Sequence, residues 1–197
     1  MKTRIAVLVS GGGTNLQALI DAQGRGELPD GEIALVISNN PKAFALDRAR
    51  RAGIDTAVCM KPELEPAIQR ELAAHGIEMI VLAGFMAILS KDFVSRWPER
   101  IINIHPSLIP SFCGAGFYGL RVHEAALRYG VKVTGATVHY VNEIPDGGRI
   151  IAQKAVDIED GDTPETLQRR VMEQAEWILL PRATEAVAKR IRMEKSI

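Results

Sequence analysis

The sequence has few cysteines, no long apolar run and no excess of either charge. Cys59 and Cys113 are the two cysteines among 197 residues, and their wide separation matches no metal or redox motif, which indicates unpaired thiols. Lysine plus arginine and aspartate plus glutamate number 24 each, so no basic field points to nucleic acid or a membrane surface as the main partner. The apolar run from Ile5 to Val9 is too short for a signal peptide or a membrane span. We therefore expect a cytoplasmic protein that binds neither nucleic acid nor membranes and holds any anion locally.

The sequence also has no repeats, low-complexity tracts or linkers. Hydrophobic residues make up 47% and charged residues 24%, which are ordinary values for a globular protein. A chain of this length can bury a full core, so we expect a single domain over residues 1–197, with a charged, frayed tail at 189–197. Strand and helix patterns alternate regularly, which predicts an α/β fold with three layers and a mainly parallel central sheet.

The most informative stretch is an apolar strand at residues 101–105 that carries Asn103 and His105. Alternation along a strand places both side chains on the same face, and Pro106 and Pro110 end the strand directly afterwards. In open α/β sheets, that end of a strand is where ligands bind. An amide can donate to a developing oxyanion and an imidazole can carry a proton near neutral pH, which is the equipment for acyl-type transfer. It is equally plausible, from these residues alone, that both groups are simply satisfied at a strand end.

A glycine-rich turn follows the strand at Ile5 to Val9, and residues 10–15 (SGGGTN) lead into a helix. Strand, glycine turn and helix together direct free backbone N–H groups at an anion. The turn is neither a Walker loop, because no Gly-Lys-Ser/Thr follows, nor a dinucleotide fingerprint, because Leu16 stands where the third glycine belongs. A tight turn that merely needs flexible residues is the alternative.

Further strands are predicted at 33–37, 56–59, 77–83, 131–141 and 150–156, and further helices at about 44–52, 62–74, 91–97 and 121–129. The apolar segment 84–89 is either core or the wall of a pocket for a flat ring, and the irregular segment 111–119 is expected to lie as a loop over the site. His75 is expected to be solvated, and His123 to lie in the first turn of its helix in a structural role. Asp146 lies in a turn, where aspartate often makes only local bonds.

The last helix is predicted from about Thr163 towards Arg192. Asp162 is expected as its N-cap, with Glu165 reaching back, and Pro181 is expected to kink it.

Five blocks together resemble the folate-dependent formyltransferases, and within them the phosphoribosylglycinamide formyltransferases. The similarity covers about residues 4 to 185. The blocks are residues 10–18 (SGGGTNLQA), 81–86 (VLAGFM), 103–108 (NIHPSL), 135–139 (GATVH) and 146–148 (DGG). The resemblance implies the Rossmann-like formyltransferase fold, small-molecule substrates and no metal, and it leaves a homodimer open as the assembly.

The resemblance further implies transfer of the formyl group of 10-formyltetrahydrofolate, as co-substrate, to the glycinamide amine of a ribonucleotide in purine biosynthesis. Asn103 and a protonated His105 would stabilise the oxyanion, and Asp146 would hold the imidazolium and order a water for proton transfer. The residues implied for the ribonucleotide are Gly11, Gly12, Gly13, Thr14, Asn15, Met86 and Glu176; those implied for the folate are Leu82, Phe85, Met86, Ala87, Ile88, Leu89, Asn103, Val141, Asn142, Glu143, Ile144 and Asp146; those implied in support are His139, Pro106 and Ser107.

Four departures from the family pattern bear on these assignments. Many members have an arginine where Ala87 stands, and the stretch 59–71 is shorter, with only Lys61 as a stand-in for a basic phosphate contact. The loop 112–119 is longer than in many members. The block around Glu176 carries one extra residue, and Trp177 replaces a common histidine, so Glu176 is the least secure of these assignments.

Two alternative functions stay open. A formyltetrahydrofolate hydrolase shares the catalytic set, but usually has a second histidine where Pro106 stands and an N-terminal regulatory domain. A non-catalytic nucleotide- or folate-binding module would need none of Asn103, His105 and Asp146. Methionyl-tRNA formyltransferase is disfavoured, because it would need a further tRNA-binding domain and a basic surface and the sequence indicates neither.

Overall fold

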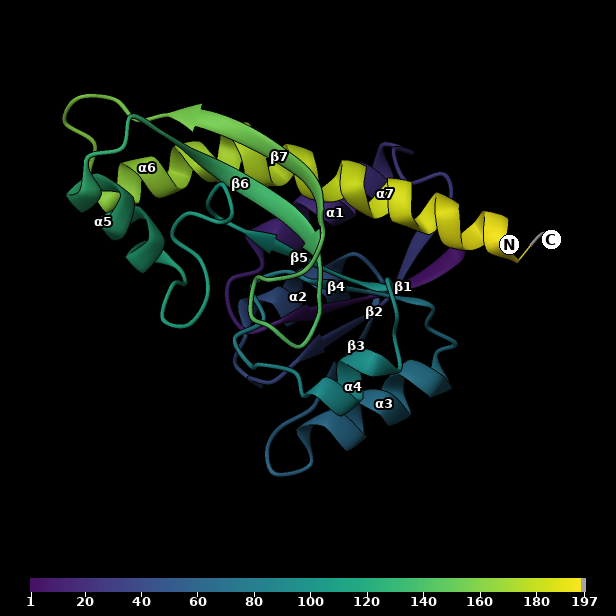
Figure 1. The fold of residues 1–197 in the computed structure, drawn as a ribbon. Coiled ribbons are helices and arrows are strands. Elements are labelled where there is room, and N and C mark those ends of the chain that lie inside the picture. The colour runs from purple at the N-terminus through teal and green to yellow at the C-terminus, as the bar shows by residue number, and fades with distance from the viewer. Residues whose placement is uncertain (196–197) are drawn as a thin grey trace.

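Seven strands form one sheet in the computed structural model, which describes residues 1–195 (Figure 1). The strands are β1 (Thr3–Val9), β2 (Gly31–Ser38), β3 (Asp55–Val58), β4 (Met79–Leu82), β5 (Ile101–His105), β6 (Val133–Tyr140) and β7 (Ile150–Asp157). Their spatial order is β3-β2-β1-β4-β5-β6-β7. Neighbours from β3 to β5 are parallel, whereas β6 is antiparallel to both β5 and β7. The prediction of a mainly parallel α/β sheet is confirmed.

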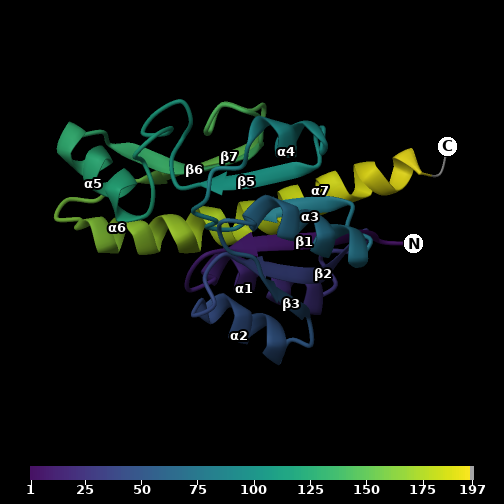
Figure 2. The same cartoon turned by 90° about the horizontal axis from the view of Figure 1, so that it is seen from below.

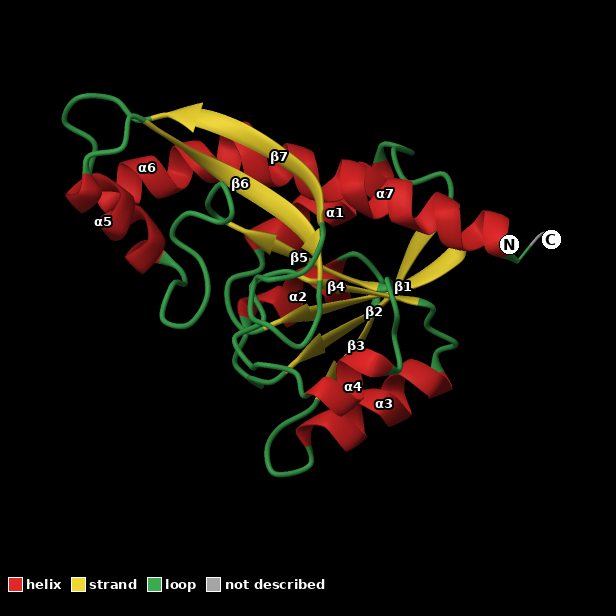
Figure 3. Cartoon of the chain, viewed as in Figure 1, coloured by secondary structure: helices red, strands yellow, loops and turns green. Residues whose placement is uncertain are grey.

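Helices cover both faces of the sheet (Figures 2 and 3). They are α1 (Thr14–Gly24), α2 (Phe44–Arg51), α3 (Leu64–Ala74), α4 (Lys91–Ser95), α5 (Leu120–Tyr129), α6 (Pro164–Val171), the π-helical turn η1 (Met172–Glu176) and α7 (Trp177–Glu194). The buried residues of α1, α2, α6 and α7 share one hydrophobic cluster, and those of α3 and α4 share another. This division produces the three layers that the sequence predicted.

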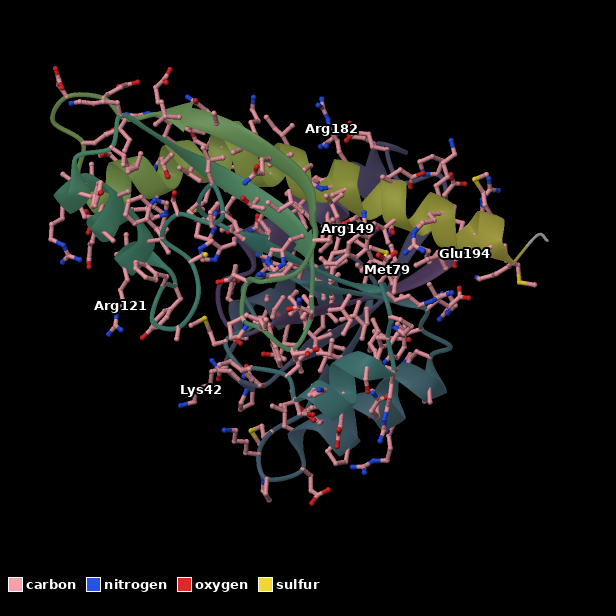
Figure 4. The ribbon with its side chains drawn as sticks, in the orientation of Figure 1. Lys42, Met79, Arg121, Arg149, Arg182 and Glu194 are labelled. Carbon is pink, nitrogen blue, oxygen red and sulfur yellow. The ribbon has the colours of Figure 1, made fainter. Side chains whose placement is uncertain are left out.

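Strand β1 lies inside the sheet, between β2 and β4, and is buried on both faces. Ile5, Val7 and Val9 pack against the α1/α7 side, and Ala6 and Leu8 pack against the α3/α4 side. A parallel strand covered by helices on both faces needs such a continuous apolar run rather than an alternating one. Met79 of β4 is equally enclosed, whereas the side chains of Lys42 and Arg121 extend outwards (Figure 4).

The start of α6 differs from the prediction. Thr163, not Asp162, is the N-cap: its side chain accepts from Thr166 N, and the Thr166 hydroxyl accepts from Thr163 N, so Glu165 does not complete the capping box. Asp162 instead pairs with Arg170, at 2.8 Å from Nη2 to Oδ1, and accepts from Glu159 N. The carboxylate was the better cap on residue type, but an ion pair with Arg170 of the same helix engages it.

The last helix contains a π-helical turn at Met172–Glu176 that was not predicted, and α7 continues through Pro181. A π-turn closes i→i+5 instead of i→i+4 hydrogen bonds, so it holds one more residue than the α-helical turn it replaces. The tail predicted as frayed is ordered helix up to Glu194, with Ile191 fully buried; Ser196 and Ile197 lie outside the described residues.

The loops that follow β1, β2, β4 and β5 all leave the same edge of the sheet, since these strands are parallel. The start of β1 and the last turns of α7 lie on the other side of the molecule (Figure 1). None of the helices formed by residues 1–195 is long and apolar enough to cross a membrane.

Candidate active site

Four polar side chains meet beyond the end of β5. The antiparallel register pairs Asn103 with His139 of β6, and Asn103 Nδ2 lies 3.1 Å from His139 Nε2. The turn after β6 brings Asp146 back, with Oδ2 at 3.5 Å from His105 Nδ1 and Oδ1 at 3.6 Å from His139 Nε2. Asn103, His105 and Asp146 therefore lie together, and His139, expected only in support, is a direct member of the cluster.

Hydrogen-bond partners assign the protons of the two imidazoles. His139 Nδ1 lies 2.8 Å from the carbonyl oxygen of Tyr140, so Nδ1 carries the proton and the neutral Nε2 accepts from Asn103. His105 Nε2 lies 2.9 Å from the carbonyl oxygen of Phe112, so Nε2 carries the proton and Nδ1 faces Asp146. In its neutral form, each ring thus donates from one nitrogen to a backbone carbonyl oxygen.

Burial and charge act in opposite directions on this cluster. Burial lowers the pKa of His105, although the Asp146 carboxylate and the Phe112 carbonyl both act to raise it. Burial alone would raise the pKa of Asp146, but the imidazoles of His139 and His105 and the Gly114 N–H outweigh it, and the pKa is lowered. These directions favour an ionised Asp146, whereas burial opposes the protonated His105 that the resemblance implied for catalysis.

The loop 111–119 covers the cluster, as predicted. Phe112 accepts from His105, and Gly114 N donates to Asp146 Oδ2 at 2.8 Å. Behind it, the buried Thr137 hydroxyl donates to Ser107 O at 2.7 Å and accepts from Ile109 N at 3.1 Å. Ser107 supports the chain after β5, and its hydroxyl donates to Ser111 O at 2.6 Å; Pro106 is half-buried at the strand end.

The glycine turn forms a second wall of the site. Gly13 is the N-cap of α1 with φ +74°, and no side chain caps the helix or places a negative charge in its first turn. The first N–H groups of α1 therefore have no intrahelical partner and can receive an anion. Ser10 links this turn to two other strand ends: its hydroxyl donates to Asn39 Oδ1 at 2.7 Å and accepts from Met86 N at 2.8 Å.

Asn15 and Glu176 join the first and last helices of the site. Asn15 Nδ2 donates to Glu176 Oε2 at 2.6 Å, and Asn15 Oδ1 is buried without a partner in the described structure. Burial raises the pKa of Glu176 to about 6, although the bond from Asn15 opposes this. Glu176 is the last residue of the π-turn, so the extra residue is absorbed immediately before it and the glutamate still reaches the glycine turn.

A cavity of about 130 Å³ lies beside the cluster. Its lining residues are Leu82, Phe85, Ala87, Ile88, Leu89, Asn103, His139, Val141, Asn142, Glu143, Ile144, Pro145 and Asp146. Every residue that the resemblance implied for the folate is in this set except Met86, which is half-exposed beside Ser10. The cavity has aliphatic and aromatic walls, and polar groups lie at the Asp146 end.

The sequence-family comparison decides the relationship. The family model described as formyl transferase matches residues 3–184, which is most of the chain. The chain belongs to the formyl transferase family.

Individual relatives are consistent with membership of the formyl transferase family. Phosphoribosylglycinamide formyltransferase of Haemophilus influenzae is 42% identical over 177 residues, which is 87% of this chain and 81% of that protein. Trifunctional purine biosynthetic protein adenosine-3 of Gallus gallus is 47% identical over 193 residues, or 95% of this chain, but the chain spans only 18% of that protein's length.

Solved formyl transferase structures share the fold. Glycinamide ribonucleotide transformylase 1 from Symbiobacterium toebii is similar with a TM-score of 0.88 and 40% identity, over 96% of this chain and 89% of that one. A formyltetrahydrofolate deformylase from Pseudomonas syringae is similar with a TM-score of 0.87 and 30% identity, over 96% of this chain and 62% of that one. The fold alone therefore does not distinguish a transferase from a hydrolase.

Several features of the candidate site were not predicted. Ser10 and Asn39 cross-link strand ends, and the backbone groups of Phe112 and Gly114 bind His105 and Asp146. Within residues 1–195, no group of three or more histidine, cysteine or acidic side chains could hold a metal ion. His123 lies in the first turn of α5 as predicted, but it is fully buried.

Proposed function

We propose that the chain transfers the formyl group of 10-formyltetrahydrofolate to the glycinamide amine of 5'-phosphoribosylglycinamide, as in purine biosynthesis. The observation that carries the proposal is the position of the Asn103–His139–Asp146–His105 cluster, which adjoins the apolar cavity and the loop that binds Asp146. The names of the H. influenzae and S. toebii relatives support the same activity.

The reaction forms one C–N bond and breaks another. The glycinamide nitrogen attacks the formyl carbon, and the formyl oxygen takes up the negative charge of a tetrahedral intermediate. Collapse of the intermediate breaks the bond to the folate N10, which receives a proton, while the attacking nitrogen loses one. The chain must therefore stabilise one oxyanion and move one proton.

Each member of the cluster has a role in this scheme. Asn103 directs one amide hydrogen at His139, which leaves the second free for the oxyanion. The oxyanion would compete with the Phe112 carbonyl for the His105 Nε2 proton. The ionised Asp146, 3.5 Å from His105 Nδ1, favours the imidazolium once charge develops nearby.

The remaining residues would hold the two substrates. Gly11 to Asn15 would receive the ribonucleotide phosphate at the start of α1, with Glu176 and Met86 beside the substrate. The cavity beyond Asn103 would take the pterin, since its walls suit a flat organic ring.

The decisive experiment measures folate product from a 10-formyl folate with and without glycinamide ribonucleotide. We expect product only when the ribonucleotide is present. Equal product without it would establish a hydrolase, the activity named for the P. syringae structure. Binding of both ligands without turnover would indicate a binding module and remove the catalytic roles. Thr14→Val should raise the KM for the ribonucleotide and leave the KM for the folate unchanged; the reverse pattern would place the phosphate elsewhere.

A further inference from the structure

An arginine of α2 lies against the glycine turn. Arg48 Nε donates to Gly12 O at 2.8 Å, Nη1 donates to Gln17 Oε1 at 3.0 Å, and the guanidinium carbon lies 5.0 Å from the centre of the Phe44 ring. Three contacts thus fix a side chain that would otherwise be mobile. The guanidinium lies beside the first turn of α1, where the proposed substrate carries its phosphate.

The approach of α2 to the turn is unusually close. Ala45 N donates to Gly11 O at 3.1 Å, and a Cβ on Gly13 would lie 2.6 Å from Ala45 Cβ and 3.5 Å from Arg48 Cδ. A glycine is therefore required at position 13 for packing as well as for the positive φ. This packing holds Arg48 in place against the turn.

Arg48 and Thr14 line a cavity of about 320 Å³ together with Gln17, Ala18, Asp21, Arg25 and Trp177. Of the other two charged side chains in this cavity, Arg25 already has a carboxylate partner and Asp21 is remote from Thr14. Arg25 is bound by both carboxylate oxygens of Glu27, at 2.7 and 2.9 Å. Asp21 accepts from Gln17 Nε2 and lies roughly 10 Å along the helix from Thr14, at 1.5 Å per residue. Of the described side chains in this cavity, Arg48 is the cation without a carboxylate partner.

The guanidinium of Arg48 also has N–H donors that these contacts do not use. A guanidinium offers five N–H groups, of which the contacts to Gly12 and Gln17 use two. A guanidinium with free donors suits a phosphate, which accepts two parallel bonds. Two lysines are less suitable: Lys61 is exposed in the turn before α3, and Lys42 extends away from the ribbon (Figure 4).

We propose that Arg48 is a further substrate-binding residue, whose guanidinium holds the 5'-phosphate of the ribonucleotide on the glycine turn. The inference rests on the proposed function. Arg48 supplies the basic phosphate contact for which the sequence offered only Lys61, and it does so from a different element. The N–H groups of α1 orient the phosphate, and Arg48 supplies a full positive charge at a site where a chain of zero net charge has no general basic field to attract it.

The test compares Arg48→Met and Arg48→Lys with Arg50→Met, an exposed arginine of the same helix that pairs with Asp47 at 3.0 Å. Arg48→Met should raise the KM for glycinamide ribonucleotide about 10- to 100-fold, the usual loss for a hydrogen bond to a charged group. The values of kcat and of the KM for the folate should stay within about twofold. Arg48→Lys should restore part of the loss, and Arg50→Met should behave as wild type. An unchanged KM in Arg48→Met would overturn the proposal.

Two further measurements separate phosphate binding from a structural role and from the proposed function. The unphosphorylated glycinamide ribonucleoside should show the same KM with wild type and Arg48→Met; an equal rise for both substrates would mean that Arg48 only shapes the turn, which would overturn the proposal. Calorimetry with ribose 5-phosphate needs no turnover. Weaker binding to Arg48→Met would support the phosphate contact even if formyl transfer were absent, and equal binding would contradict it.

Discussion

Asn103 can offer only one amide hydrogen to a substrate, because the other points to His139 Nε2. The Asn103→Ala variant should therefore lose one oxyanion donor and leave the His139 nitrogen without a partner. We expect kcat to fall by about 10²–10³, the usual cost of removing one such donor. Steady-state formyl transfer measures the effect, and urea unfolding checks that the variant is folded. An unchanged kcat would exclude Asn103 from the chemistry.

His123 should make stability depend on pH. It is fully buried, neither ring nitrogen has a partner in the described structure, and burial lowers its pKa to about 4. Between pH 6.5 and 4 the unfolded chain binds a proton at this residue and the folded chain does not, so the free energy of unfolding falls as the pH falls. The loss approaches about 3 kcal/mol at pH 4.

The His123→Leu variant isolates this contribution when urea unfolding is measured from pH 7 to pH 4. Its free energy of unfolding should fall less steeply with pH than that of the wild type. Glu176 acts in the opposite direction, since its raised pKa lets the folded state bind a proton between pH 6 and 4.5, but it is common to both proteins. Parallel curves would show that His123 is protonated in the folded state.

At the scale of elements, the glycine turn and α2 form one unit. Gly13 and Gly26 have nearly the same backbone angle, with φ of +74° and +75°, but only a Cβ on Gly13 would meet another residue. Gly26→Ala therefore measures the backbone cost alone, roughly 1 kcal/mol. Gly13→Ala should lose clearly more stability and also raise the KM for the ribonucleotide. Equal losses in thermal unfolding would show that α2 can move away from the turn.

The π-turn of the last helix can be tested by deletion. Removal of the exposed Gln174 should convert Met172–Glu176 into ordinary α-helix and leave Glu176 near Asn15, so stability and the KM for the ribonucleotide should change little. Removal of the exposed Arg182 is the control, because it rotates the rest of α7 by about 100° and moves Ala183, Val187 and Ile191 out of the core. Chemical unfolding compares the two; equal losses would show that the π-turn cannot be removed.

These elements also show what the sequence predicts well. Strand β5 was placed correctly, because prolines bound an apolar run and mark its end. The N-cap of α6 was misplaced, because Asp162 and Thr163 both suit a cap and the ion pair of Asp162 with Arg170 decides between them. In the site, alternation placed Asn103 and His105 on one face, but only the resemblance added Asp146. The contacts of Phe112, Gly114 and Arg48 could not be predicted, because backbone groups and a helical arginine have no distinctive pattern.

At the scale of the whole molecule, the proposed site and the chain ends are far apart. The Thr3 hydroxyl of β1 donates to Ala188 O of α7 at 2.8 Å, and Lys195 pairs with Glu78, just before β4. Both ends therefore lie at the amino ends of the strands, and the site lies beyond their carboxyl ends (Figure 1).

A folded protein fused to either end should leave the KM for both substrates within about twofold. The same protein inserted at Ala115 should abolish turnover, because the loop 111–119 binds His105 and Asp146. Steady-state kinetics on the three fusions checks this. Loss of activity in either terminal fusion would show that the ends influence the site.

The adjacency of the two ends has an evolutionary consequence. A domain whose two chain ends lie on the same side, away from the proposed site, can be inserted into a longer polypeptide without a change to that site. The Gallus gallus relative, of which this chain matches 18%, has such a long polypeptide with three functions by name. The layout that positions α7 against β1 thus also makes the domain portable.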